Sequence, residues 1–75
     1  MSIIIYTDGS AKGNPGNGGY GIVMISGDHR RELQQGFRLT TNNRMELLAV
    51  IVAIESIKNE NSVITIYSDS KYVKI

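Results

Sequence analysis

Two aspartates of this 75-residue chain, Asp8 and Asp69, each stand at the end of a short run of apolar, β-branched and aromatic residues. An acid in that position is typical of an Asx turn, in which the carboxylate hydrogen-bonds the backbone of its own loop. It is also typical of a binding site, because α/β proteins tend to bind ligands at the carboxyl ends of their strands. If the two runs are neighbouring parallel strands, the two carboxylates lie close together.

Glu46 is the third candidate acid. The spacing Asn43-x-x-Glu46 fits a capping box, with Asn43 as the N-cap and Glu46 as the third residue of a helix. The first turn of that helix faces the sheet edge if the preceding strand ends there, and Glu46 then also points toward the two aspartates. Helix cap and metal ligand are compatible roles, and both remain open.

Three carboxylates at one edge repel each other, and the sequence around them offers too few Lys or Arg side chains to neutralise them. A divalent cation would do so. Oxygen ligands favour Mg²⁺ or Mn²⁺ over zinc, and phosphodiester hydrolysis commonly uses two such ions. The acids therefore predict metal-dependent phosphodiester chemistry.

Three asparagines, Asn14, Asn42 and Asn43, lie in segments that flank the proposed acids. Their amides offer both donors and an acceptor, as recognition of a ribose 2′-hydroxyl requires. Plain turn formation is the alternative for each of them. The single histidine, His29, belongs to a charged hairpin and is expected at the solvated surface.

The spacing Gly16-x-Gly18-x-x-Gly21 matches the dinucleotide-binding fingerprint. That fingerprint must open a helix, whereas residues 20–26 are strand-like and no suitable acid follows about twenty residues later. Dinucleotide binding is therefore not expected.

Runs of β-branched, aromatic or loosely alternating apolar residues between turn-forming residues predict four strands, at residues 3–7, 20–26, 30–40 and 63–67, with a glycine-rich loop over 9–19 and a bulge at Gly36. The first three strands are close together in the sequence and should be antiparallel. A helical crossover then makes the fourth strand parallel to one of them. The expected class is α/β with a mixed sheet.

The crossover helix is expected over residues 45–57, after a polar cap at Thr41-Asn42-Asn43. Apolar residues occupy nearly every face of this helix, so it should be buried on more than one side. The string Ser68-Asp69-Ser70 predicts the cap of a second helix.

Composition bounds the class of protein. A chain of 75 residues fits one small domain of marginal stability, and it contains no cysteine for disulfides or thiolate metal sites. No apolar run is long enough to span a membrane, and the N-terminus lacks the pattern of a secretory signal, so a cytoplasmic location is expected. The net charge of +1 gives the whole chain little attraction to nucleic acid.

Five strings together resemble type 1 ribonuclease H, in the right order and across essentially the whole chain: Tyr6-Thr7-Asp8-Gly9-Ser10, Gly13-Asn14-Pro15-Gly16, Gly18-Gly19-Tyr20-Gly21, Thr41-Asn42-Asn43-Arg44-Met45-Glu46-Leu47 and Tyr67-Ser68-Asp69-Ser70. The resemblance implies a ribonuclease H-like fold, a five-stranded mixed sheet with helices on both faces. It also implies an endonuclease that hydrolyses the RNA strand of RNA–DNA hybrids with Mg²⁺ or Mn²⁺.

The same resemblance implies the roles of individual residues. It assigns Asp8, Glu46 and Asp69 as catalytic acids that bind metal, together with Gly9 as a metal-binding residue. It assigns the substrate-binding residues Ser10, Asn14, Thr41, Asn42 and Asn43, with the asparagines near RNA 2′-hydroxyls and Thr41 at a DNA phosphate.

The family carries a fourth carboxylate, a mobile loop histidine and often a basic protrusion, none of which occurs in this sequence. Residues 1–75 are therefore expected to be the incomplete N-terminal portion of one ribonuclease H domain, ending before the last strand and the C-terminal helices. Such a fragment should be inactive and should self-associate or bind the missing C-terminal half. A non-catalytic hybrid-binding module is the main alternative, and an actin-like ATPase is a remote one.

Overall fold

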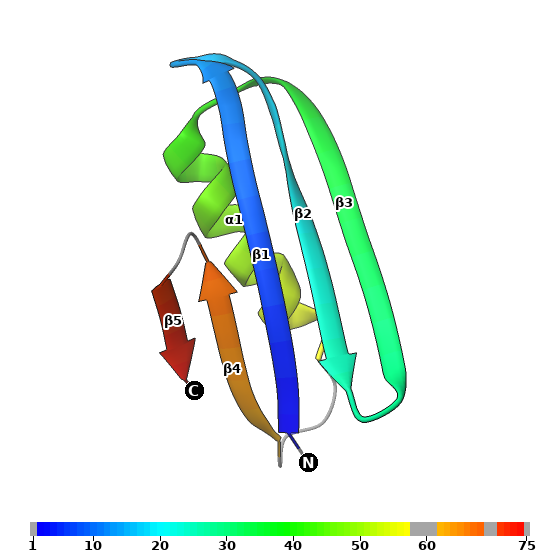
Figure 1. The fold of residues 1–75 in the computed structure, drawn as a ribbon. Coiled ribbons are helices and arrows are strands. Elements are labelled where there is room, and N and C mark those ends of the chain that lie inside the picture. Colours follow the sequence, from blue (N-terminus) through cyan, green and yellow to red (C-terminus); the bar gives the residue numbers. More distant parts are fainter. Residues whose placement is uncertain (1, 58–61, 69–70, 75) are drawn as a thin grey trace.

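The computed structural model describes residues 2–57, 62–68 and 71–74. Their elements are β1 (Ser2–Gly13), β2 (Gly16–Ser26), β3 (His29–Thr40), α1 (Asn42–Glu55), β4 (Val63–Ser68) and β5 (Lys71–Lys74). The strands form one sheet in the order β3-β2-β1-β4-β5, with α1 packed against it (Figure 1).

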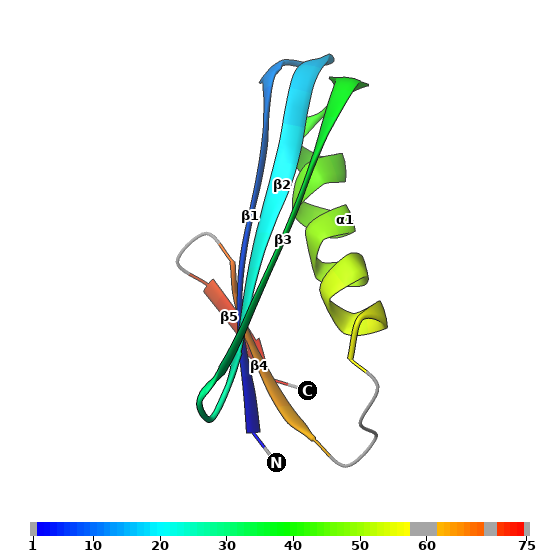
Figure 2. The same ribbon diagram turned by 90° about the vertical axis from the view of Figure 1, so that its right-hand side faces the viewer.

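The central strand β1 sets the layers of the fold. Ile3, Ile5 and Thr7 are buried, whereas Ile4 and Tyr6 are exposed, which is the period of two expected for a strand with one covered face. Figure 2 shows α1 on one side of the sheet, and no described helix covers the other side. The described residues thus form two layers, and the second sheet face is open.

The strand directions confirm the predicted mixed sheet. β1 pairs antiparallel with β2, and β2 with β3, whereas β1 and β4 are parallel, and α1 lies between β3 and β4 in the chain. In the parallel pair Thr7 lies opposite Ser68. The two strands that were expected to end in acids, β1 and β4, are therefore neighbouring and parallel, although β1 continues past Asp8 to Gly13.

The core lies between α1 and the sheet. Its largest fully buried side chains are Ile5, Ile22, Met45 and Ile66. Burying a side chain of this size stabilises the fold by roughly 1.5–3 kcal/mol. The fully buried alanines of α1, Ala49 and Ala53, are one turn apart and let the helix approach the sheet closely.

The remaining face of α1 is apolar and uncovered by the described residues. Leu47 is 63% exposed, and Leu39 of the adjacent strand β3 is 71% exposed. Together with Phe37, Leu48 and Ile51 they line an open groove of about 340 Å³ between α1 and β3. The described residues thus bury only one side of α1, and the prediction that the helix is buried on more than one side stays a prediction.

The glycine-rich segment was predicted as a loop, and that prediction is wrong. β1 continues to Gly13 and β2 begins at Gly16, so the segment is a long hairpin. Gly18 shows why glycine is compatible with strand here, because a Cβ on it would lie 2.5 Å from the Ser10 carbonyl oxygen. Glycine thus permits close strand packing as well as loops.

The bulge is also displaced from its predicted position. Gly36 pairs regularly with Gly19, and the register shifts instead between Gly16 and Gly18 of β2. Gly16 lies opposite Thr40 and Gly18 opposite Phe37, so β3 carries the extra residue. The bulge therefore lies beside the β1–β2 turn.

The predicted second helix is wrong for Lys71–Lys74, which is a strand antiparallel to β4. One helical turn fixes three residues for a single hydrogen bond, whereas pairing gives these backbone groups partners at the edge of β4. The proposed cap residues Asp69 and Ser70 lie outside the described residues. No described helix has the length and apolar character needed to span a membrane.

Candidate active site

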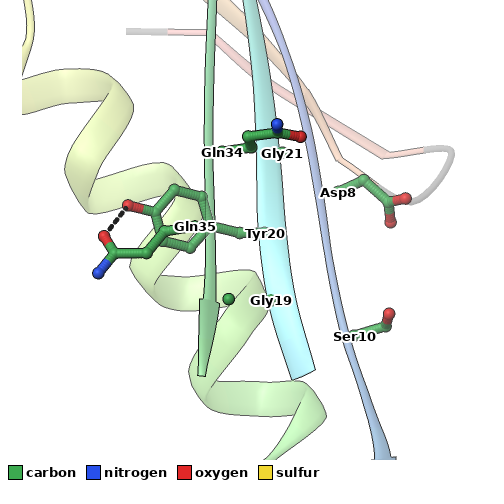
Figure 3. Close-up of a pocket in the computed structure, with 8 residues that line it drawn as sticks. Asp8, Ser10, Gly19, Tyr20, Gly21, Gln34 and Gln35 are labelled. Carbon is green, nitrogen blue, oxygen red and sulfur yellow. Dashed lines mark hydrogen bonds between the residues drawn. The ribbon is translucent and has the colours of Figure 1, made fainter. Parts of the chain in front are cut away.

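Asp8 lies on the open face of the sheet. Its neighbours Thr7 and Gly9 face α1, so the alternation of β1 directs Asp8 the other way, and its side chain is exposed. Figure 3 shows Asp8 and Ser10 pointing to one side of the sheet, and Tyr20 and Gln35 to the opposite side. The latter two are joined there by a hydrogen bond of 3.2 Å from the Tyr20 hydroxyl to Gln35 Oε1.

An open pocket of about 610 Å³ extends from Asp8 and Ser10 across β2 to Gln34 and Gly36 of β3. Gly21 lies directly opposite Asp8, and a Cβ built on it would meet nothing within 4 Å. The missing side chain therefore leaves the Asp8 carboxylate accessible from the side of β2. Sequence reasoning missed Gly21 and Gln34, because only the strand register places them beside Asp8.

Glu46 lies near the start of α1, and the predicted capping box is wrong. The N-cap is Thr41, whose Oγ1 accepts a hydrogen bond of 3.2 Å from the Arg44 backbone N–H. Thr41 is extended, and the helix begins at Asn42, so Arg44 occupies the third helical position that a capping box requires for its acid. Glu46 is the fifth helical residue, and it is half-buried.

Gly9 brings this part of the helix to the residue after Asp8. A Cβ built on Gly9 would lie 2.5 Å from the Met45 carbonyl carbon and 2.8 Å from the Glu46 backbone nitrogen. Only a residue without a side chain permits that approach, so Gly9 has a clear packing role. The contact places the backbone of Glu46 against β1, next to Asp8 in sequence.

The third predicted acid, Asp69, lies outside the described residues. Its preceding residue, Ser68, pairs with Thr7, which precedes Asp8. Within the described part of the chain, no three His, Cys, Asp or Glu side chains are grouped closely enough to hold a metal ion. The gathering of all three acids and the metal role of Gly9 stay predictions.

The predicted asparagines are gathered at one end of the molecule. The Asn42 carboxamide oxygen accepts a hydrogen bond of 2.5 Å from the Ala11 backbone N–H, which ties the start of α1 to β1. Asn14 is exposed in the β1–β2 turn, and Asn43 is exposed in the first turn of α1. Asn42 therefore has a structural contact, as Thr41 has in the helix cap, and their substrate roles stay predictions.

Several known proteins are similar in sequence to nearly the whole of this chain. Ribonuclease H of Syntrophus aciditrophicus (strain SB) is 61% identical over 71 residues, which are 95% of this chain and 40% of that relative. Ribonuclease H of Shewanella amazonensis (strain ATCC BAA-1098 / SB2B) is 65% identical over 72 residues, 96% of this chain and 46% of the relative. The chain thus spans less than half the length of these relatives.

Solved structures agree with the fold. LC11-RNase H1, isolated from compost by a metagenomic approach, aligns with a TM-score of 0.80 at 36% identity, over 93% of this chain and 55% of that one. The structure of LC11-RNase H1 in complex with RNA/DNA hybrid aligns with a TM-score of 0.68 at 34% identity, over 89% and 55%. The family model described as RNase H matches residues 1–75, and the chain belongs to the ribonuclease H family.

Proposed function

We propose that residues 1–75 are the N-terminal portion of an endonuclease domain that hydrolyses the RNA strand of RNA–DNA hybrids. The observation that carries the proposal is the contact of Gly9 with the backbone of Met45 and Glu46, because it brings a second acid-bearing element to β1 at the residue after Asp8. The substrate class is supported by the related LC11-RNase H1, whose structure contains an RNA/DNA hybrid.

The acids near this contact between β1 and α1 suit a divalent ion with oxygen ligands. Asp8 is exposed opposite a glycine, and Glu46 is half-buried on the element that packs beside it. Asp8, Glu46 and Asp69 would hold Mg²⁺ or Mn²⁺, with Gly9 contributing at the same point of β1. When bound, such ions activate water and stabilise the leaving oxygen of a phosphodiester.

Polar side chains of β1, the β1–β2 turn and the start of α1 would position the hybrid for cleavage. Asn14 is exposed in the β1–β2 turn and Asn43 in the first turn of α1, and Asn42 is held against β1 by the bond that it accepts from Ala11. Their amides can pair with 2′-hydroxyls of the RNA strand, which DNA lacks. In this proposal Ser10, beside Asp8, contacts the RNA strand, and Thr41 holds a phosphate of the DNA strand.

The proposal also covers the behaviour of residues 1–75 alone. The groove at Leu39 and Leu47 exposes apolar side chains, which favours self-association or binding of the complementary half of a ribonuclease H domain. We therefore expect no appreciable cleavage by residues 1–75 without that half. A cytoplasmic location agrees with a chain that contains no cysteine.

The test is cleavage by a chimera of residues 1–75 and the remaining part of the Syntrophus aciditrophicus relative. With Mg²⁺, the chimera should cut the labelled RNA strand of a hybrid and leave single-stranded RNA and duplex DNA intact. Asp8→Asn should abolish cutting, whereas Glu55→Gln, a matched change at the exposed end of α1, should not. A chimera that binds hybrid without cutting it would favour the non-catalytic alternative.

A further inference from the structure

Three polar side chains cross the sheet beside the β1–β2 turn, one on each of three neighbouring strands. Lys12 of β1 pairs with Asn17 of β2. On the other side of Asn17, the bulge places Arg38 and Leu39 of β3 opposite this one residue. Lys12, Asn17 and Arg38 are all exposed.

The three side chains share the open face of the sheet with Asp8. Along β1, alternation places Lys12 on the same face as Asp8 and Ser10, which point away from the helix side (Figure 3). Arg38 lies between Phe37 and Leu39, which both line the groove against α1, so Arg38 faces the other way. Asn17 likewise alternates with Gly18, whose Cβ would meet Thr40 on the buried side.

The spacing suits a nucleic-acid strand that passes Asp8. Strands lie about 4.8 Å apart, so the backbones of Lys12 and Arg38 are about 10 Å apart, and their long side chains can converge over Asn17. Lys12 follows Asp8 by four residues, or about 13 Å at ~3.3 Å per residue. That distance corresponds to a few nucleotides of a duplex with a rise of about 3.4 Å per base pair.

Both cations are available for an anion. Among the described residues neither Lys12 nor Arg38 pairs with a carboxylate, in contrast to Arg30, which bonds Glu32 at 3.0 Å near the opposite end of β3. We infer that Lys12, Asn17 and Arg38 form a phosphate-binding site for the RNA strand, a few nucleotides from the phosphodiester at Asp8. This inference rests on the proposed function and adds a backbone contact to the same substrate.

The test measures binding of residues 1–75 to a fluorescent RNA–DNA hybrid at several salt concentrations, without added divalent metal so that the RNA stays intact. Each lost phosphate contact should reduce the slope of log affinity against log salt by about 0.9. The slope for the double variant Lys12→Gln/Arg38→Gln should therefore be smaller than that of the parent chain by about 1.8. When salt is raised from 50 to 200 mM, the fold-loss of affinity should be roughly ten times smaller for the variant than for the parent chain.

The control is Arg30→Gln/Arg31→Gln, which removes the same charge at the β2–β3 turn and should leave the slope within about 0.5 of the parent value. Replacing RNA phosphates one at a time by neutral methylphosphonate should weaken the parent chain at one or two positions, to which the Lys12/Arg38 variant is insensitive. Equal slopes for the two double variants would overturn the inference and leave the proposed function standing. A parent chain that does not bind hybrid even at low salt would also overturn the inference, whereas the proposed function is judged by cleavage with the chimera.

Discussion

Gly9→Ala should damage the protein more than its size suggests, because the new methyl group has no space. A Cβ at this position would lie 2.5 Å from the carbonyl carbon and oxygen of Met45 and 2.8 Å from the nitrogen of Glu46. All three are backbone atoms, so relief requires a movement of α1 relative to β1. Ordinary contact begins near 3.4 Å, and 3.4 − 2.5 gives a displacement of 0.9 Å.

Overpacking of this kind costs about 1–3 kcal/mol. Urea unfolding of the chimera, followed by circular dichroism, should therefore give a free energy of unfolding lower by that amount. The displacement also moves Glu46 relative to Asp8, and a shift of about 1 Å at a catalytic group can reduce the rate by roughly 10²-fold. Gly9→Ala should thus lose both stability and cleavage.

Gly21→Ala is the matched control, since it adds the same methyl group to the neighbouring strand, where a Cβ meets nothing within 4 Å. Its free energy of unfolding should be unchanged or higher by up to about 1 kcal/mol, because alanine reduces the entropy of the unfolded chain. If Gly9→Ala and Gly21→Ala unfolded at the same urea concentration, the close contact between β1 and α1 would be refuted.

Three further predictions concern other parts of the molecule. Thr7→Val should raise the free energy of unfolding by about 1 kcal/mol in urea titrations, because the Thr7 hydroxyl is buried and has no hydrogen-bond partner among the described residues, whereas Thr7→Ser should give no such gain. Asn42→Ala should lower the free energy of unfolding by about 1 kcal/mol, because the hydrogen bond from Ala11 is lost. Asn43 is exposed in the same turn, so Asn43→Ala should lower this free energy much less. Residues 1–75 should sediment as oligomers, and Leu47→Gln should shift them toward the monomer; an equal shift for Val63→Gln, which lies outside the groove, would show that the groove is not the contact.

The sequence predicts the layers of this fold well where a pattern has one physical cause. The β-branched and aromatic residues 3–7 predict a strand, and the apolar residues of α1 predict a helix with a second face to cover. The helical crossover predicts a fourth strand parallel to one of the first three, and the structure shows that its partner is β1.

The errors arise where one residue type serves two purposes. Glycine is favoured in loops and also where strands pass closely, so the segment from Gly9 to Gly19 was misassigned. Thr41 and Asn43 are both good N-cap residues, and the backbone conformation of Thr41 decides between them. The strand β5 depends on the free edge of β4, which no local pattern reveals.

The sequence predicted which residue types form the candidate site, but it predicted only part of how these residues are arranged in space. Asp8 at the end of an apolar run indicated a position at a strand end, which is wrong, because β1 continues to Gly13. The placement of Asp8 on the open face opposite Gly21 depends on the register of β1 and β2. Asn42 was expected to contact substrate, and its bond to Ala11 could not be inferred, because that contact joins residues 31 positions apart.

The central claim is that Asp8 and Glu46 hold the same divalent ion. Isothermal titration of Mn²⁺ into residues 1–75, and into the chimera, tests it through the variants Asp8→Asn and Glu46→Gln, with Glu55→Gln as the control on α1. Each of the first two variants should bind Mn²⁺ at least tenfold more weakly than the parent, a loss of about 1.4 kcal/mol, and the control should bind as the parent does. Equal Mn²⁺ affinity for the parent, Asp8→Asn and Glu46→Gln would contradict a shared metal site.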